Sequence, residues 1–157
     1  MPPEGQLPEV LALFGPTASG KTAVAEALAR RLGTEVVSAD ALQVYRGLEI
    51  LTDQPRTPTR LVAIKELTEE MSVGEYAPLA HAAIDELVER HGTAVVAGGT
   101  GLYLRAALTE LGIPPAAPAQ VRARAERAYD ADPRAAFARL EALDPRAAAA
   151  VHPHDRR

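Results

Sequence analysis

The chain contains no cysteine among its 157 residues, so disulfide bonds and thiolate metal sites are excluded. No uninterrupted apolar run approaches the roughly 20 residues that a membrane-spanning helix needs. The first eight residues are acidic and rich in proline, whereas a signal peptide begins with basic residues and an apolar segment. From these absences we expect a soluble, cytoplasmic protein without membrane contact.

Lysine is also scarce, since the chain has only two lysines beside fifteen arginines. The net charge of −4 argues against indiscriminate coating of nucleic acid. The charge is uneven, because residues 119–157 carry eight arginines against six acidic residues, while the preceding part carries nine basic against fifteen acidic residues. This asymmetry favours an anionic partner near the C-terminal part, although a solvated helical surface is the simpler explanation of the charge alone.

A phosphate-binding pattern occupies the stretch from Val10 to Thr22, which reads V-L-A-L-F-G-P-T-A-S-G-K-T. Its two glycines allow backbone conformations that place successive N–H groups around an anion, and a following helix would add its N-terminal partial charge. Lys21 supplies a full positive charge, and the Thr22 hydroxyl is suited to a phosphate-bound Mg²⁺. The spacing predicts a phosphate or diphosphate site without distinguishing the two. The expected binding residues are Gly15, Pro16, Thr17, Ala18, Ser19, Gly20, Lys21 and Thr22.

The hydrophobic periodicity predicts alternating strands and helices along the first part of the chain. Short apolar or β-branched runs predict strands, at 10–14, 35–38, 93–97 and, as a candidate, 60–64. Helical spacing with capping signals predicts helices, at 21–32, from 72 to about 91 and after 100. Pro78 would begin the second of these helices or kink its first turns. A helical turn is expected at 41–47 and a loop at 52–59.

Strand, phosphate loop, helix and strand, in this order, are the opening unit of an α/β fold. We predict a P-loop NTPase-like parallel sheet flanked by helices over residues 1–112, followed by a proline-rich linker at 113–118. Residues 119–157 are predicted to form a mainly helical region in which two Asp-Pro pairs begin helices. Three strands are few for such a sheet, so further segments are expected to complete it.

Three segments should meet at the carboxyl edge of this sheet, because each follows a predicted strand. They are the phosphate loop, Asp40 and the segment Gly98-Gly99-Thr100. Asp40 between two anion-binding loops suggests a catalytic carboxylate, whereas a simpler role is to cap the turn at Leu42. Thr100 would be the N-cap of a helix while also binding a ligand. Tyr45 and Tyr103 are expected to lie in the core rather than stack on a ligand.

Four segments carry a resemblance to a known family. They are Gly15–Thr22, Ser38–Arg46 (S-A-D-A-L-Q-V-Y-R), Gly98–Tyr103 (G-G-T-G-L-Y) and His152–Asp155 (H-P-H-D). In this order they resemble the tRNA dimethylallyltransferases, also called isopentenyl-tRNA or IPP transferases. The resemblance implies transfer of a dimethylallyl group from its diphosphate to the N6 amine of the adenosine 3′-adjacent to the anticodon in tRNA, with Mg²⁺. The implied partners are a tRNA anticodon stem-loop and dimethylallyl diphosphate, and we expect a monomer.

The resemblance also implies roles for individual residues. Asp40 stands where the family has the carboxylate that takes the proton of the attacking amine, and Lys21 and Thr100 complete the implied catalytic set. The phosphate loop would stabilise the negative charge of the departing diphosphate, with hydrogen bonds from Thr17, Ser19 and Thr100. Contacts to tRNA are implied for Asp40, Ala41, Leu42, Gln43, Thr100 and Arg122.

Two departures from the family pattern keep other functions open. The chain reads Leu51-Thr-Asp-Gln-Pro55 where the family usually has Gly-Thr-x-Lys-Pro, and family members normally continue well past the His-Pro-x-Asp segment. One alternative is a small-molecule kinase that binds ATP, against which stands the lack of a second Asp-x-x-Gly element and of an arginine-rich lid. The other is an inactive diphosphate- or RNA-binding module, which the early C-terminus favours. His152 and His154 are expected at the surface rather than as zinc ligands.

Overall fold

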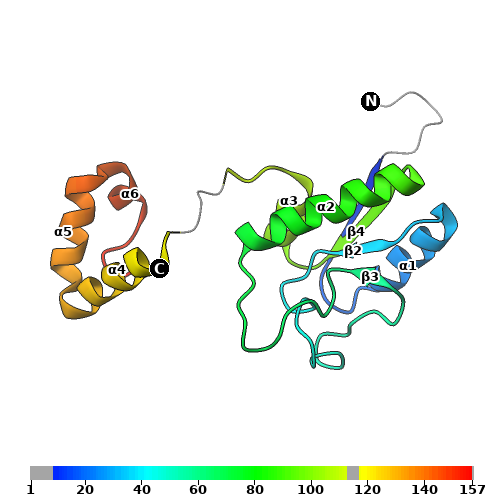
Figure 1. The fold of residues 1–157 in the computed structure, drawn as a ribbon, viewed down its shortest axis with the longest axis horizontal. Helices are drawn as coiled ribbons and strands as arrows, with labels where there is room; N and C mark the ends of the chain where they lie inside the picture. The colour runs from blue at the N-terminus through cyan, green and yellow to red at the C-terminus, as the bar shows by residue number, and fades with distance from the viewer. Residues whose placement is uncertain (1–8, 113–116, 157) are drawn as a thin grey trace. The chain divides into compact units, whose positions relative to one another are not determined.

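The computed structural model describes residues 9–112 and 117–156. The chain divides into two compact units, Met1–Ile113 and Pro114–Arg157. The predicted linker at 113–118 falls mainly on residues outside the described ranges. The first unit holds the sheet, and the described part of the second consists of helices and short connections (Figure 1).

The sheet of the first unit has four parallel strands in the order β1-β4-β2-β3 (Figure 1). Their bounds are β1 (Val10–Phe14), β2 (Val36–Ser38), β3 (Thr59–Arg60) and β4 (Ala94–Gly98). The α/β fold class with a parallel sheet is confirmed, and three of the strands lie within one residue of their predicted bounds. β4 pairs with both β1 and β2 and therefore occupies an interior position in which Ala94, Val95 and Val96 are fully buried.

Helices cover both faces of this sheet (Figure 1). The helices are α1 (Lys21–Leu32), α2 (Val73–His91) and α3 (Gly101–Leu108). Because side chains alternate along a strand, Val36 and Val95 pack with the alanines of α1, whereas Val37 and Val96 pack with α2 and α3 on the opposite face. The result is the helix–sheet–helix arrangement expected of a phosphate-loop fold.

The ends of the first two helices follow their sequence signals. Gly20 and Gly33 flank α1 with φ of 81° and 68°, left-handed values that glycine adopts without strain. The Ser72 hydroxyl caps α2 by accepting the N–H of Glu75 at 3.1 Å. Pro78 lies inside α2, so the alternative that it begins the helix is wrong.

The candidate strand predicted at 60–64 is wrong beyond Arg60. β3 ends at Arg60, and Leu61 and Ala63 take left-handed conformations with φ of 62° and 53°. These residues bond elsewhere: the N–H of Ala63 donates to Gln43 O at 2.9 Å and that of Ile64 to Val44 O at 2.8 Å. Tertiary hydrogen bonds therefore override the strand propensity of this run. The partner stretch at 41–47 forms hydrogen-bonded turns rather than one helical turn.

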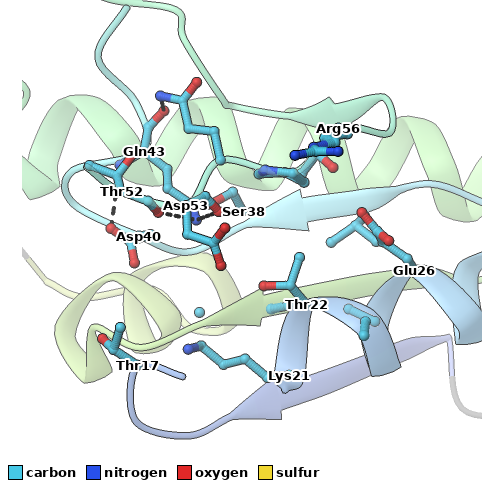
Figure 2. Close-up of a pocket in the computed structure, with 18 of the residues that line it drawn as sticks. Thr17, Lys21, Thr22, Glu26, Ser38, Asp40, Gln43, Thr52, Asp53 and Arg56 are labelled. Carbon is cyan, nitrogen blue, oxygen red and sulfur yellow. Dashed lines mark hydrogen bonds between the residues drawn. The ribbon is translucent and has the colours of Figure 1, made fainter. Parts of the chain in front are cut away.

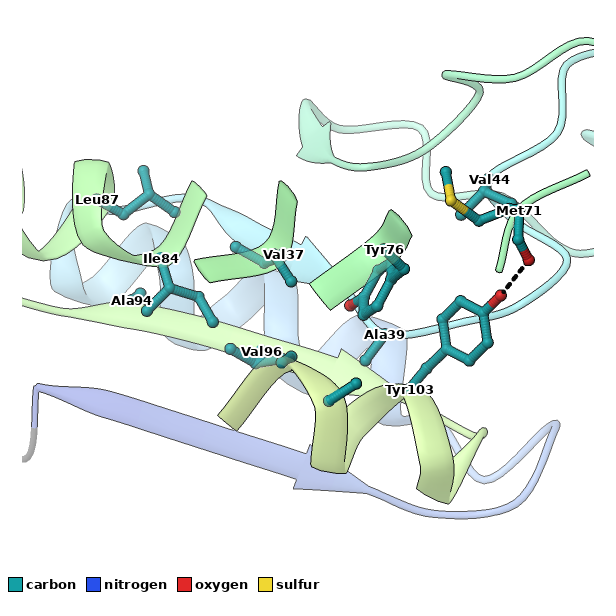
Figure 3. Close-up of a cluster of buried hydrophobic side chains, with 13 residues drawn as sticks. Val37, Ala39, Val44, Met71, Tyr76, Ile84, Leu87, Ala94, Val96 and Tyr103 are labelled. Carbon is teal, nitrogen blue, oxygen red and sulfur yellow. Dashed lines mark hydrogen bonds between the residues drawn. The ribbon is translucent and has the colours of Figure 1, made fainter. Parts of the chain in front are cut away.

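Three tyrosines connect the core to the carboxyl edge of the sheet, and two of them, Tyr76 and Tyr103, are shown in Figure 3. Tyr76 and Tyr103 are buried with ring centroids 4.6 Å apart, and the Tyr103 hydroxyl donates to Met71 O at 3.0 Å. The Tyr45 hydroxyl accepts the N–H of Met71 at 3.1 Å. The Tyr76 hydroxyl donates to the carbonyl of Ser38 at 2.9 Å, at the end of β2. Tyr45 and Tyr103 are thus structural, as expected.

A Tyr76→Phe substitution tests this tie. Removing the hydroxyl should lower the free energy of unfolding by about 1 kcal/mol at pH 7. Burial raises the pKa of Tyr76 above its usual value, so the unfolded chain releases the proton first and the wild type loses stability as the pH rises above about 10. The difference between wild type and variant should therefore shrink from pH 7 to pH 10.5 in urea titrations.

Tyr129→Phe is the matched control, because that exposed hydroxyl makes only a long hydrogen bond, 3.5 Å to Pro153 O in the second unit. It should change stability by less than about 0.5 kcal/mol at every pH. A Tyr76→Phe effect that is constant with pH would contradict the shifted titration.

Gly98 is required by a close approach between β4 and the residue after β2. A Cβ at Gly98 would lie 2.5 Å from the Ala39 carbonyl carbon and 2.8 Å from Ala39 Cβ, which is closer than atoms can come. We expect Gly98→Ala to lower the free energy of unfolding by about 1–3 kcal/mol. In Gly101→Ala the new methyl would meet only the Phe14 ring at 3.7 Å, so this control should be neutral or stabilising. Equal thermal stability of the two variants would refute the clash.

The second unit consists of α4 (Ala119–Ala131), α5 (Pro133–Leu143) and α6 (Pro145–Ala150). Asp132 and Asp144 cap the last two helices by accepting two backbone N–H groups each, so the Asp-Pro signals are confirmed. Arg156 forms an ion pair with Asp130 at 2.8 Å. Among the described residues of this unit only Ala148 is buried, so its apolar core is very small.

Candidate functional site

The strand register brings three loops to one edge of the sheet. Phe14 of β1 pairs with Gly98 of β4, and Ser38 of β2 pairs with Ala97. The phosphate loop, Asp40 and Gly99 follow directly, as the sequence predicts. A Cβ at Gly99 would lie 3.3 Å from Gly15 O and 3.6 Å from Lys21 Nζ. The loop after β4 therefore lies against the phosphate loop.

The phosphate loop places its lysine at the start of α1. The Lys21 ammonium donates to Pro16 O at 3.0 Å, across the turn of the loop. The left-handed residues are Ala18, with φ of 64°, and Gly20, whereas Gly15 does not have a positive φ. Only one of the two predicted glycines thus supplies the special conformation. Gly15 instead makes room, because a Cβ there would lie 3.1 Å from Ser19 Oγ.

Asp40 caps the turn that follows it, as the simpler interpretation predicts. Its Oδ1 accepts the N–H of Leu42 at 2.9 Å and that of Gln43 at 3.3 Å. Oδ2 forms no hydrogen bond within the described ranges. One oxygen of the carboxylate is therefore fixed by the backbone, while the other is available to a ligand.

Asp40 and Lys21 line the same pocket, which has a volume of about 580 Å³ (Figure 2). Eight predicted site residues contribute to its lining, namely Thr17, Ala18, Gly20, Lys21, Thr22, Asp40, Leu42 and Gln43. Five others in this unit do not, namely Gly15, Pro16, Ser19, Ala41 and Thr100. Thr100 takes the N-cap position of α3 but its side chain makes no capping hydrogen bond. Arg122 belongs to the second unit, where it pairs with Glu126 at 3.6 Å.

Gln43 is the centre of a polar network in the lining of the pocket. Its side-chain oxygen accepts the Ser38 hydroxyl at 2.9 Å, and its amide donates to Thr52 O at 3.1 Å and to Asp53 O at 3.3 Å. The side-chain amide of Gln54 donates to two backbone carbonyls, Gln43 O at 3.1 Å and Tyr45 O at 2.8 Å. Residues 52–57, which belong to the segment predicted as a loop at 52–59, form one wall of the pocket.

Sequence reasoning missed several lining residues, among them Glu26, Ser38, Asp53, Arg56 and Thr57. Nothing in the local pattern distinguishes Glu26, which lies about one helical turn beyond Thr22 in α1. Arg56 had a signal, because it is a cation between two prolines in a loop that follows the Asp40 segment.

Several oxygen atoms that line the pocket are of the kind that Mg²⁺ prefers as ligands. They belong to the Thr22 hydroxyl and to the carboxylates of Glu26, Asp40 and Asp53. Within the described residues, no group of three or more histidine, cysteine, aspartate or glutamate side chains could hold a metal by itself. This composition fits Mg²⁺ bound jointly with phosphate oxygens rather than in a cage of protein ligands.

His152 and His154 lie at the surface, as the sequence predicts. The rings of His152 and His154 pack against each other with centroids 5.4 Å apart, and both residues are exposed. In the part of the chain that the structure describes, no helix is both long and apolar enough to cross a bilayer.

Two family models cover the chain between them. The model described as "IPP transferase" matches residues 43–157, and the model described as "Isopentenyl transferase" matches residues 8–65. A curated tRNA dimethylallyltransferase from Anaeromyxobacter sp. (strain Fw109-5) is 48% identical over 153 residues, which are 93% of this chain and 51% of that protein. The chain spans about half the length of the curated relatives it matches.

Solved structures give the same result. The full-length tRNA isopentenylpyrophosphate transferase from Bacillus halodurans is 36% identical with a TM-score of 0.63, over 94% of this chain and 52% of that one. A eukaryotic dimethylallyltransferase acting on tRNA has a TM-score of 0.79 at 23% identity, over 95% of this chain and 39% of that one. The second likeness supports the fold alone.

Proposed function

The chain belongs to the tRNA dimethylallyltransferase family, and from this we propose that it carries the diphosphate-binding and catalytic part of such an enzyme. The reaction is transfer of a dimethylallyl group to the N6 amine of the adenosine 3′-adjacent to the anticodon in tRNA. The observation that carries the proposal is that Lys21 and Asp40 line one pocket, while the turn engages only Oδ1 of Asp40.

The phosphate loop side of the pocket binds the leaving group. As the bond between the allylic carbon and the diphosphate oxygen breaks, negative charge builds on the diphosphate. The Lys21 ammonium and the positive N-terminal end of α1 stabilise that charge, because both lie at the same loop. Thr22, with diphosphate oxygens, would hold Mg²⁺, which supplies further charge neutralisation when bound.

Asp40 is the base. The adenosine amine is a poor nucleophile because its lone pair is delocalised into the ring. When the amine attacks the allylic carbon, Asp40 accepts one of its protons at Oδ2, the oxygen that the turn leaves free. The turn fixes the position of the carboxylate, and this positioning brings Oδ2 to the amine.

Most of the proposed tRNA contacts lie at the same edge of the sheet, and one comes from the second unit. Asp40 to Gln43 form a rigid turn next to the pocket, and the exposed Leu42 side chain is available to a nucleobase. Thr100 and Arg122 are proposed as further contacts from α3 and α4. We also propose that the protein acts as a cytoplasmic monomer.

The experiment is transfer of labelled dimethylallyl to an anticodon stem-loop by the wild-type chain, with binding of dimethylallyl diphosphate and ATP measured beside it. We expect labelled RNA, released diphosphate and a preference for dimethylallyl diphosphate. Tight ATP binding with negligible dimethylallyl diphosphate binding would instead identify a kinase. Diphosphate binding without transfer would identify a binding module that needs further segments for turnover.

A further inference from the structure

Arg56 is the second basic side chain among the described residues that line the pocket, and it lies outside the four segments that carry the family resemblance. Among the described residues that line the pocket, only Lys21 and Arg56 carry a positive charge, whereas three carry a negative charge, namely Glu26, Asp40 and Asp53. A lining with more negative than positive charges disfavours an anionic ligand, so each cation has a large influence on diphosphate affinity.

The Arg56 guanidinium is available to a ligand. Within the described residues it forms no ion pair and no hydrogen bond. By contrast, Arg60, four residues later, is held by Glu35 at 2.7 Å and Glu86 at 3.2 Å. An unpaired arginine on the wall of a pocket is available to a ligand, and its planar fork of N–H donors matches phosphate oxygens.

The backbone that carries Arg56 is anchored on both sides. On one side, the Gln54 amide donates to Gln43 O at 3.1 Å and to Tyr45 O at 2.8 Å. On the other side, the Thr57 hydroxyl donates to Glu26 Oε1 at 2.8 Å, which ties the loop to α1. Arg56 is therefore positioned by two fixed neighbours, although it belongs to a segment without regular structure.

Lys21 and Arg56 reach the pocket from different walls. Lys21 comes from the phosphate loop and the first turn of α1, whereas Arg56 comes from the loop before β3, and Figure 2 shows them on opposite sides with Thr22 between them. A diphosphate has ionised oxygens on two phosphorus atoms, so it can engage two separate cations at once.

We propose that Arg56 is a diphosphate-binding residue that contacts the phosphate oxygens from the wall opposite Lys21. This inference rests on the proposed function, because it concerns the same ligand. The role belongs to this chain's own loop, in which Gln54 is neutral and already bonded, so that Arg56 provides the positive charge.

The test is calorimetric titration of the full chain with inorganic diphosphate and Mg²⁺. We expect Arg56→Gln to weaken binding about tenfold to a hundredfold and Arg56→Lys to weaken it less, because charge is kept and the fork is lost. Arg31→Gln is the matched control, since Arg31 is an exposed arginine in the last turn of α1 and does not line the pocket. It should bind diphosphate within about twofold of wild type.

A parallel titration with Lys21→Gln separates the two possible failures. If Lys21→Gln weakens binding and Arg56→Gln does not, the role of Arg56 is refuted while the diphosphate pocket stands. If neither weakens binding, or the wild type does not bind, the proposed function is refuted together with this inference. Weaker binding of an anticodon stem-loop with unchanged diphosphate affinity in Arg56→Gln would show an RNA contact and would also overturn the proposal.

Discussion

Asp40→Asn should lower the rate of dimethylallyl transfer by about 10² to 10⁴-fold, while the affinity for diphosphate changes little. The amide oxygen of asparagine can still accept the N–H groups of Leu42 and Gln43, so the turn that Asp40 caps is kept. What is lost is the second carboxylate oxygen, which would receive the proton of the amine.

A second variant separates the two roles of Asp40, the cap of the turn and the proposed base. Asp40→Ala removes both the cap and the base, so it should lose transfer to a similar extent and also about 1 kcal/mol of stability. Asp85→Asn is the control, because Asp85 is an exposed carboxylate of α2 that does not line the pocket. If Asp40→Asn transferred dimethylallyl at the wild-type rate, Asp40 would be only a capping residue.

Lys21→Met should lower the transfer rate by about 10² to 10³-fold and also weaken diphosphate binding. The lysine lies at the loop and offers the only ammonium group among the described residues of the pocket, where it now bonds to Pro16 O. On binding it would exchange this neutral acceptor for an ionised oxygen, which is a stronger bond.

The chain offers an unusually clean control, because it has only one other lysine. Lys65 pairs with Glu75 at 2.6 Å and Glu69 at 3.5 Å, outside the pocket. Lys65→Met should leave transfer unchanged at a temperature where the variant is folded. A loss of activity in Lys65→Met that equals the loss in Lys21→Met would show that the assay reports on folding rather than on the pocket.

Local patterns predict the parts of this fold whose causes are local. Gly33 ends α1 and Ser72 begins α2 because their signals act within a few residues. The run at 60–64 fails as a strand because its N–H groups bond to Gln43 and Val44, which are close only after folding. Short apolar runs carry no information about such partners.

The residues of the candidate site also differ in whether local patterns predict them. The phosphate loop and Asp40 could be predicted because their roles follow from spacing after a strand. Glu26 could not, because nothing in its local pattern distinguishes it from other helical residues. Arg56 has only its position between two prolines as a signal, because its place on the pocket wall depends on the tertiary bonds of Gln54 and Thr57. The placement of Thr100 outside the pocket lining likewise depends on how α3 begins rather than on its motif.

The pairing of β1 has a consequence for the order of events during synthesis. In the described part of the chain, β1 is hydrogen-bonded to β4 alone, so the phosphate loop has no sheet to attach to until β4 has been made. At about 5–20 residues per second, the ribosome needs roughly 4–16 s for the intervening segment. During that time the apolar face of α1 lacks Val95, and closing so long a loop adds an entropic cost. The nascent chain should therefore bind diphosphate only after β4 has emerged.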